Sequence, residues 1–146
     1  KGTAAPLARG LNKTSRIEVT LDFAKIIAAR LAAGATALAA GDVLEVLPVP
    51  AKSIISNVGM DVTTAAGVTS TIAIGDGTAA TGYLAATSAN ATGVSGGVPV
   101  LSAGAFAPTL SGGKLYTAAD TIDITIGTAV PAAAVVRVFA TLTDVS

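Results

Sequence analysis

The chain of 146 residues contains no cysteine, no histidine and no tryptophan. Without cysteine it can form no disulfide and has no nucleophilic thiol. Its cysteine content therefore does not indicate whether it works in an oxidising or a reducing compartment. Without histidine it lacks the commonest general base and the commonest ligand of transition metals. A nucleophile–base pair is therefore hard to assemble, and we expect no enzyme activity, no cofactor and no metal site.

Charged residues and long apolar runs are also scarce. Charged side chains make up 12% of the chain, about half of the usual fraction. Hydrophobic residues make up 51%, but Thr, Ser, Gly and Pro interrupt every apolar run before the ~18 residues that a membrane helix needs. Residues 77–113 carry no charge at all. We expect no membrane partner, and a surface with so little charge is tolerable where neighbouring subunits cover it.

The net charge is zero but unevenly distributed. Residues 1–30 hold six basic and two acidic side chains, whereas residues 31–146 hold three basic and seven acidic ones. Residues 1–15 are small, polar and aperiodic, so we expect an extended basic arm there, followed by a single domain over residues 16–146. The arm is either a solvated tail or a tether that orders on an acidic partner surface.

We favour the tether, because a flexible basic segment gains charge-assisted contacts and can pair with a strand edge. Nucleic acid fits less well as the partner, because the body of the chain is acidic and carries no known nucleic-acid module. The residues that we expect to bind the partner surface or a neighbouring subunit are Lys1, Pro6, Leu7, Arg9, Leu11, Lys13 and Arg16.

Most of the chain has the patterning of β-strands. Apolar and polar residues alternate in "RIEVTLD", "TIDITIG" and "VVRVFATLTDV", and turn sequences such as "GDG" and "SGGK" separate the strands. About eight short strands at roughly 8–12-residue spacing are typical of an antiparallel sandwich or barrel. We predict an all-β fold, an antiparallel β-sandwich of jelly-roll type. The strands with the clearest alternation are at about 16–22, 43–49, 54–64, 68–75, 121–127 and 135–143.

Two further features refine this prediction. "FAKIIAARLAA" has near-helical spacing of its apolar residues, and Asp22 can cap its start, so one short helix is possible there. Pro48 and Pro50 restrict the strand at 43–49 to the edge of a sheet or to a bend.

The stretch "IAIGDGTAATGYL" at residues 72–84 resembles a ligand loop. A phosphate loop needs a lysine after its last glycine, but Tyr83 follows Gly82. A calcium loop needs several acidic residues, and Asp76 is the only one between Asp61 and Asp120. We therefore expect a turn between strands, in which Asp76 bonds to the local backbone.

The remaining polar and aromatic residues also favour structural roles. A separation of three on a strand places Asp120 and Asp123 on opposite faces, which argues against an acid–base pair. We expect Asp120 to shape a turn and Asp123 to lie on the solvent face. The five aromatic residues are scattered, so we expect core or interface packing for Phe23, Tyr83, Phe106, Tyr116 and Phe139.

An ordered set of segments resembles small structural proteins of tailed-phage virions. The set comprises "GDVLEVLPVPA", a "VTT" strand, "GDG", "KLYTAADTIDITIG" and "VVRVFATLTDV", and it covers about residues 40–146. The resemblance implies a head decoration, or cement, protein that binds the outer surface of the phage head and stabilises the shell. It also implies a β-rich fold, the major capsid protein as partner, and a homotrimer.

A second class stays open at this point. The chain could be a jelly-roll binding module of a virion fibre or tail, which would recognise a receptor or a glycan. An aromatic platform, or clustered Asp and Asn residues near a loop, would favour that class.

Overall fold

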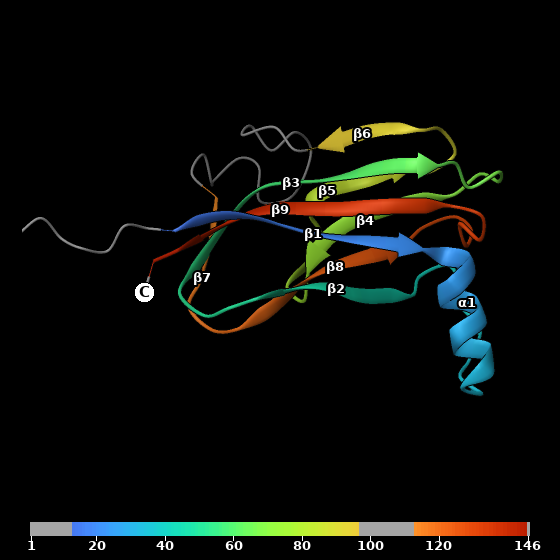
Figure 1. Ribbon diagram of the computed structural model, residues 1–146, viewed down its shortest axis with the longest axis horizontal. Helices are drawn as coiled ribbons and strands as arrows, with labels where there is room; N and C mark the ends of the chain where they lie inside the picture. Colours follow the sequence, from blue (N-terminus) through green and yellow to red (C-terminus); the bar gives the residue numbers. More distant parts are fainter. Residues whose placement is uncertain (1–12, 97–112, 146) are drawn as a thin grey trace, which may run out of the picture.

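The computed structural model describes residues 13–96 and 113–145, which form two antiparallel β-sheets packed face to face (Figure 1). Their strands, with one helix between the first two, are β1 (Thr14–Asp22), α1 (Phe23–Ala32), β2 (Val43–Val49), β3 (Ser53–Thr64), β4 (Thr71–Asp76), β5 (Ala79–Ser88), β6 (Gly93–Gly96), β7 (Lys114–Tyr116), β8 (Asp120–Ile126) and β9 (Val135–Asp144).

The first sheet has the order β1-β9-β3-β6, and the short β7 pairs with β3 as well. The second sheet has the order β2-β8-β4-β5. The prediction of an all-β antiparallel sandwich is therefore confirmed, and this strand order is consistent with jelly-roll winding, in which the chain passes repeatedly between the two sheets. The predicted edge position is also confirmed, because β2, which contains Pro48, is an outer strand of its sheet.

The core lies between the sheets and follows the alternation of the sequence. Ile122, Ile124 and Ile126 of β8 are fully buried, and so are Val136 and Val138 of β9. Successive side chains of a strand point to opposite faces, so one parity of each strand forms the core. The remaining fully buried large side chains are Phe23, Val49, Ile55, Val58, Met60, Val62, Ile72, Ile74 and Tyr83.

Helix α1 projects from one end of the sandwich, whereas the end of β9 lies at the other (Figure 1). The predicted cap is present, because the Asp22 side chain accepts a hydrogen bond from the Lys25 backbone N–H. Phe23 anchors the first turn in the core and is the only buried residue of the helix, while Leu31 is 77% exposed. The helix is therefore held at its base and presents most of its surface outward.

Several boundaries differ from the predicted ones. β1 begins at Thr14, so two residues expected in the arm belong to the sandwich. β4 begins at Thr71 rather than at 68, and Val68 is exposed before it. The described residues form nine strands. Two of them, the glycine-rich β6 and the three-residue β7, were not predicted. The described part of the chain contains no helix long and apolar enough to cross a membrane.

Candidate functional site

The "GDG" stretch forms the tight turn between β4 and β5. Asp76 Oδ1 accepts hydrogen bonds from the backbone N–H of Thr78 at 2.9 Å and of Ala79 at 3.2 Å, which confirms the expected turn. Gly75 is required here, because a Cβ at this position would lie 1.9 Å from the Ala79 carbonyl oxygen. The turn closes so tightly that the β5 backbone lies against β4.

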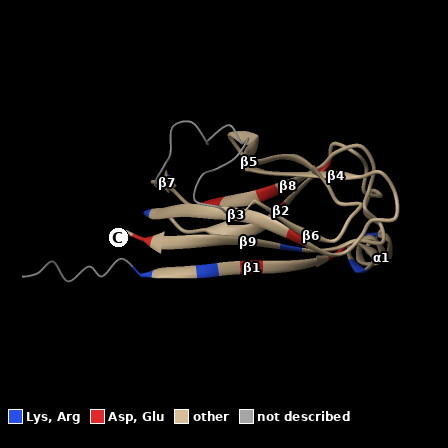
Figure 2. Cartoon of the chain, turned by 90° about the horizontal axis from the view of Figure 1, so that it is seen from above, with Lys and Arg blue, Asp and Glu red and all other residues tan. Residues whose placement is uncertain are grey.

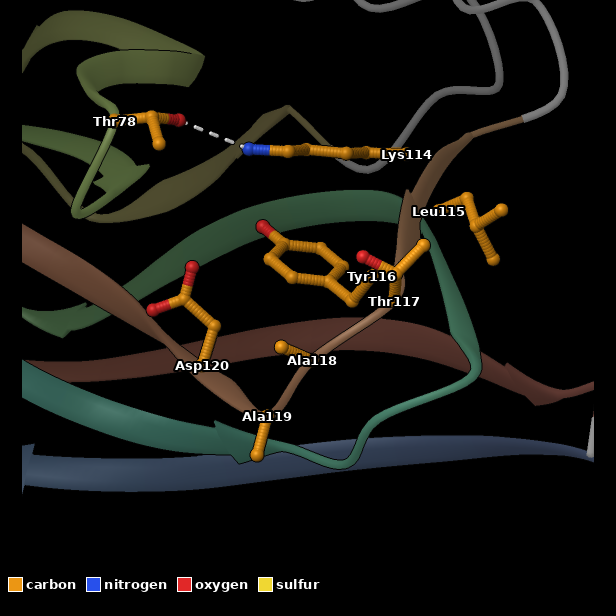
Figure 3. Close-up of a pocket in the computed structure, with 8 residues that line it drawn as sticks. All are labelled: Thr78, Lys114, Leu115, Tyr116, Thr117, Ala118, Ala119 and Asp120. Carbon is orange, nitrogen blue, oxygen red and sulfur yellow. Dashed lines mark hydrogen bonds between the residues drawn. The ribbon is translucent and has the colours of Figure 1, made fainter.

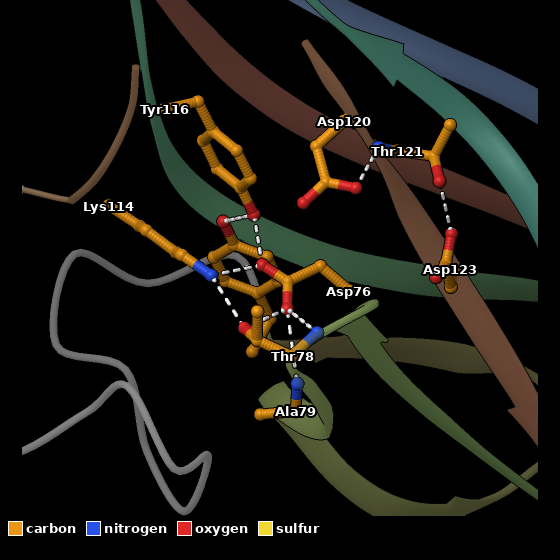
Figure 4. Close-up of polar contacts among 9 residues, drawn as sticks. Asp76, Thr78, Ala79, Lys114, Tyr116, Asp120, Thr121 and Asp123 are labelled. Atoms are coloured by element: carbon orange, nitrogen blue, oxygen red, sulfur yellow. Dashed lines mark hydrogen bonds and ion pairs between the residues drawn. The ribbon is translucent and has the colours of Figure 1, made fainter. Parts of the chain in front are cut away.

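Asp76 also makes long-range contacts that the sequence did not reveal. Its Oδ2 accepts from the Lys114 ammonium and, at 2.5 Å, from the Tyr116 hydroxyl (Figure 4). Lys114 also donates to the Thr78 hydroxyl at 3.0 Å. Because Asp76 belongs to the second sheet and β7 pairs with the first, this cluster ties the two sheets together at one end of the sandwich.

The cluster is buried and carries strong electrostatic effects. The Asp76 side chain is fully buried and that of Lys114 is 19% exposed. Burial alone would raise the pKa of Asp76, but hydrogen bonds from Lys114, Thr78 and Tyr116 outweigh it and lower the pKa to about 2. Asp76 therefore stays ionised at neutral pH and binds Lys114 as a carboxylate.

Two tyrosines complete this network. The Tyr83 and Tyr116 hydroxyls lie 2.7 Å apart. Since the Tyr116 hydroxyl already donates its hydrogen bond to Asp76, the Tyr83 hydroxyl is the donor in the bond between the two tyrosines. Burial raises the pKa of both phenols, so both remain protonated and act as donors.

A shallow pocket lies beside the cluster (Figure 3). Its volume of about 210 Å³ is below the ~300 Å³ at which small-molecule sites usually begin. Lys114 and Tyr116 line it but are already engaged with Asp76. No group of three or more residues with metal-binding side chains occurs within the described ranges. The polar side chains of the cluster are therefore engaged with one another and tie the two sheets together.

A second charged feature lies on the outer face of the second sheet. Asp123 was expected on the solvent face, and this prediction is wrong, because the residue is only 7% exposed. It does point away from the core, but β8 is an inner strand, and the β5 backbone covers Gly75, the register partner of Asp123 on β4. On the other side Asp123 is paired in register with the exposed Glu45 of β2.

Neither carboxylate of this pair has an ion-pair partner among the described residues. Among the residues that the structure describes, Asp123 accepts a hydrogen bond only from the Thr121 hydroxyl, at 2.7 Å. Burial raises the pKa of Asp123, and the negative charge of Glu45 raises it further. Two residues along β8, the Thr125 hydroxyl oxygen is buried and has no hydrogen-bond partner within residues 13–96 and 113–145. We call the face formed by Glu45, Asp123 and Thr125 the acidic face.

The outer face of the first sheet has charges that are paired. Arg137 Nη2 lies 2.8 Å from Asp61 Oδ2. Arg16 Nε lies 3.0 Å from Glu18, and the guanidinium sits 4.3 Å from the centre of the Phe139 ring. Figure 2 shows these charges, with both basic and acidic segments along β1 and acidic segments on β8.

The structure places two of the predicted partner-binding residues. Arg16 lies on the edge strand β1, in the contacts just described, and its side chain is about half exposed. Lys13 precedes β1, and its carbonyl accepts from the Asp144 N–H at 3.1 Å. The other five, Lys1, Pro6, Leu7, Arg9 and Leu11, lie outside the described residues, so their predicted role is not tested.

Phe23, Tyr83 and Tyr116 pack in the core, as expected, whereas Phe139 lies on the outer face of the first sheet beneath Arg16. Phe23, Tyr83, Tyr116 and Phe139 are all buried, with exposures between 0% and 8%. Phe106 lies outside the described residues. Among the described residues no aromatic ring is exposed as a platform for a base or a sugar.

No protein family and no curated protein sequence matches the chain. Two solved structures are similar in fold. A chain of the cyanophage Pam1 capsid asymmetric unit aligns with a TM-score of 0.56 and 18% identity, over 99% of this chain and 94% of that one. A chain of the capsid of Ralstonia phage GP4 aligns with a TM-score of 0.55 and 17% identity, over 100% and 92%. At these identities the likeness establishes a shared fold.

Proposed function

We propose that this chain is a structural protein of a phage virion, and that it decorates the outer surface of the head as a cement protein. The observation that carries the proposal is the full-length likeness in fold to chains from two phage capsid structures. The resemblance of the sequence to virion proteins supports the same role independently.

The character of the surface also supports a role in an assembly. The chain has few charges, and residues 77–113 carry none. Apolar surface is tolerable where neighbouring subunits cover it. We propose a homo-oligomer, with three copies at a three-fold position of the shell as the expected form, and no catalytic activity. The buried aromatic rings and the small pocket give no support to a glycan-binding module.

The N-terminal arm is the proposed docking element on the major capsid protein or on a neighbouring subunit. Ordering a flexible segment costs about 1–2 kcal/mol per residue of backbone entropy, and surface ion pairs return only about 0–1 kcal/mol each. Charge alone therefore cannot hold the arm. Pro6, Leu7 and Leu11 must be buried on the partner, or the backbone must pair with a strand edge.

The test uses particles that lack the protein and rebinding of the purified chain. Because β1 begins at Thr14, deletion of residues 1–12 leaves the sandwich intact. We expect the full chain to bind the particles saturably, and the deleted chain to bind at least about tenfold more weakly, with a shallower dependence on salt because fewer ion pairs form. A chain with Leu7→Ser and Leu11→Ser keeps the charges and separates the apolar contribution. Absence of saturable binding by the full chain contradicts the cement role, and equal occupancy by the deleted chain contradicts the docking role of the arm.

A further inference from the structure

We propose that the acidic face of the second sheet receives the basic N-terminal segment, residues 1–12, of a neighbouring copy of this chain. The inference deepens the proposed function and rests on it, because it names the surface through which copies in the shell hold one another. It assigns a partner-binding role to Glu45 and Asp123.

The acidic face has an unmet electrostatic requirement. Glu45 and Asp123 are directly opposite each other on neighbouring strands, and like charges in such a pair are destabilising. Asp123 is 7% exposed, so water screens its charge poorly. The Thr125 hydroxyl oxygen, buried and unpaired in the described part of the chain, adds an acceptor beside them. A cationic side chain placed here would relieve the repulsion and could donate to all three groups.

The outer face of the first sheet and the buried cluster do not share this requirement. On the outer face of the first sheet Asp61 pairs with Arg137, and Glu18 pairs with Arg16. In the buried cluster Asp76 pairs with Lys114. The acidic face is therefore the place among these described surfaces where a basic segment gains most.

The N-terminal segment matches this face in charge. Residues 1–12 contain Lys1 and Arg9 and no acidic residue. They include three apolar side chains able to cover apolar surface, Pro6, Leu7 and Leu11. Beside Glu45, Val43 is 54% exposed, and β2 is an edge strand whose outer backbone groups are open to an added strand.

Geometry favours a neighbouring copy over the same chain. β1 runs from Thr14 toward α1, whereas Glu45 lies near the start of β2, which follows α1. The chain thus enters β1 at the end of the sandwich opposite to α1 and the start of β2 (Figure 1). Twelve residues span at most about 40 Å, enough to cross to an adjacent subunit. A contact between two different surfaces of the same chain is head-to-tail, and such contacts form a ring when the rotation between copies closes.

The test compares charge-reversed full-length chains by sedimentation velocity over a range of protein and salt concentrations. Glu45→Lys should weaken self-association at least about fivefold, because it adds repulsion to the basic segment. Glu18→Lys is the matched control, an exposed acidic residue on the first sheet, and should change it less than about twofold. Arg9→Glu should weaken association like Glu45→Lys. Melting temperatures confirm that each variant is folded.

The decisive sample is an equimolar mixture of the Arg9→Glu chain and the Glu45→Lys chain. If segments dock between copies, the mixture associates more tightly than either variant alone, because a contact between the two variants joins a segment to a face of opposite charge. In a mixed ring of three this holds at two of the three contacts. No recovery on mixing, a wild-type chain that stays monomeric, or equal effects of Glu45→Lys and Glu18→Lys overturns the proposal. Particle rebinding is measured separately, so a failure there contradicts the cement role and leaves the self-association result standing.

Discussion

The buried pair of Asp76 and Lys114 allows a quantitative prediction. Lys114→Met removes the ammonium but keeps most of the apolar stem, so Asp76 remains as a buried carboxylate without its cation. Breaking one partner of a buried ion pair costs about 3–5 kcal/mol. Asp76 keeps its bonds from Tyr116, Thr78 and the backbone, so we expect a loss near the lower end, about 3 kcal/mol. For a domain of this size that lowers the melting temperature by roughly 6–12 °C.

The same pair fixes the pH dependence. In the wild type the pKa of Asp76 is lowered from 3.8 to about 2, which corresponds to about 2 kcal/mol of stability. A group with a lowered pKa stabilises the fold above its unfolded value, so this stability is complete above about pH 5 and is lost as the pH falls from about 4 to 2. In Lys114→Met burial is no longer opposed by the ammonium, so protonation of Asp76 becomes easier. The difference in the free energy of unfolding between the wild type and Lys114→Met should therefore decrease as the pH is lowered.

Thermal and urea unfolding of both proteins between pH 2.5 and 7 measures this difference. Lys25→Met is the matched control, because Lys25 pairs with Asp22 at the surface and its side chain is 85% exposed; it should stay close to the wild type at every pH. Two outcomes would contradict this account of the buried pair. Lys114→Met could destabilise the protein no more than the control at pH 7, or the difference in unfolding free energy between Lys114→Met and the wild type could be independent of pH.

Two further predictions concern packing and use urea unfolding at pH 7. Tyr116→Phe removes the hydroxyl between Tyr83 and Asp76 and should cost about 1–3 kcal/mol, since it leaves buried groups unpaired; a loss below about 0.5 kcal/mol contradicts the network. Phe23→Ala empties the fully buried base of α1 and should cost about 3–5 kcal/mol, whereas Leu31→Ala on the same helix should change stability by less than about 0.5 kcal/mol. Equal losses for the two helix variants would show that α1 is not held at its base alone.

The strands were predictable wherever local patterning coincides with burial. β2 has the predicted bounds, and β8 and β9 differ from theirs by one residue, because alternating Ile and Val side chains define a buried face directly. The cap of α1 was predictable for the same local reason. β6 and β7 were missed, since strands of four and three residues with glycine carry almost no periodic signal and depend on pairing with β3.

The charged sites were predictable only in part, because they depend on contacts that are distant in sequence. The turn at Asp76 follows from its own glycines, but its cation lies 38 residues away on a strand without a sequence signature. The parity of Asp123 was correct, yet its burial comes from the neighbouring strands and from the β5 backbone over Gly75. An alternation pattern reports which way a side chain points, and it does not report what covers it.

The two ends of the sandwich differ in how well they suit the insertion of a peptide. Asp144 N–H bonds to the Lys13 carbonyl, and Val145 N–H bonds to the Lys52 carbonyl, so the strands that lead to both termini are fastened side by side. The loop after α1 lies at the opposite end, where Arg30 holds it through two bonds to the Thr36 carbonyl. A peptide inserted beside Ala37 would thus be displayed at the end of the sandwich opposite to Lys13 and Val145. The same molecule can present cargo at one end while the other remains free for attachment.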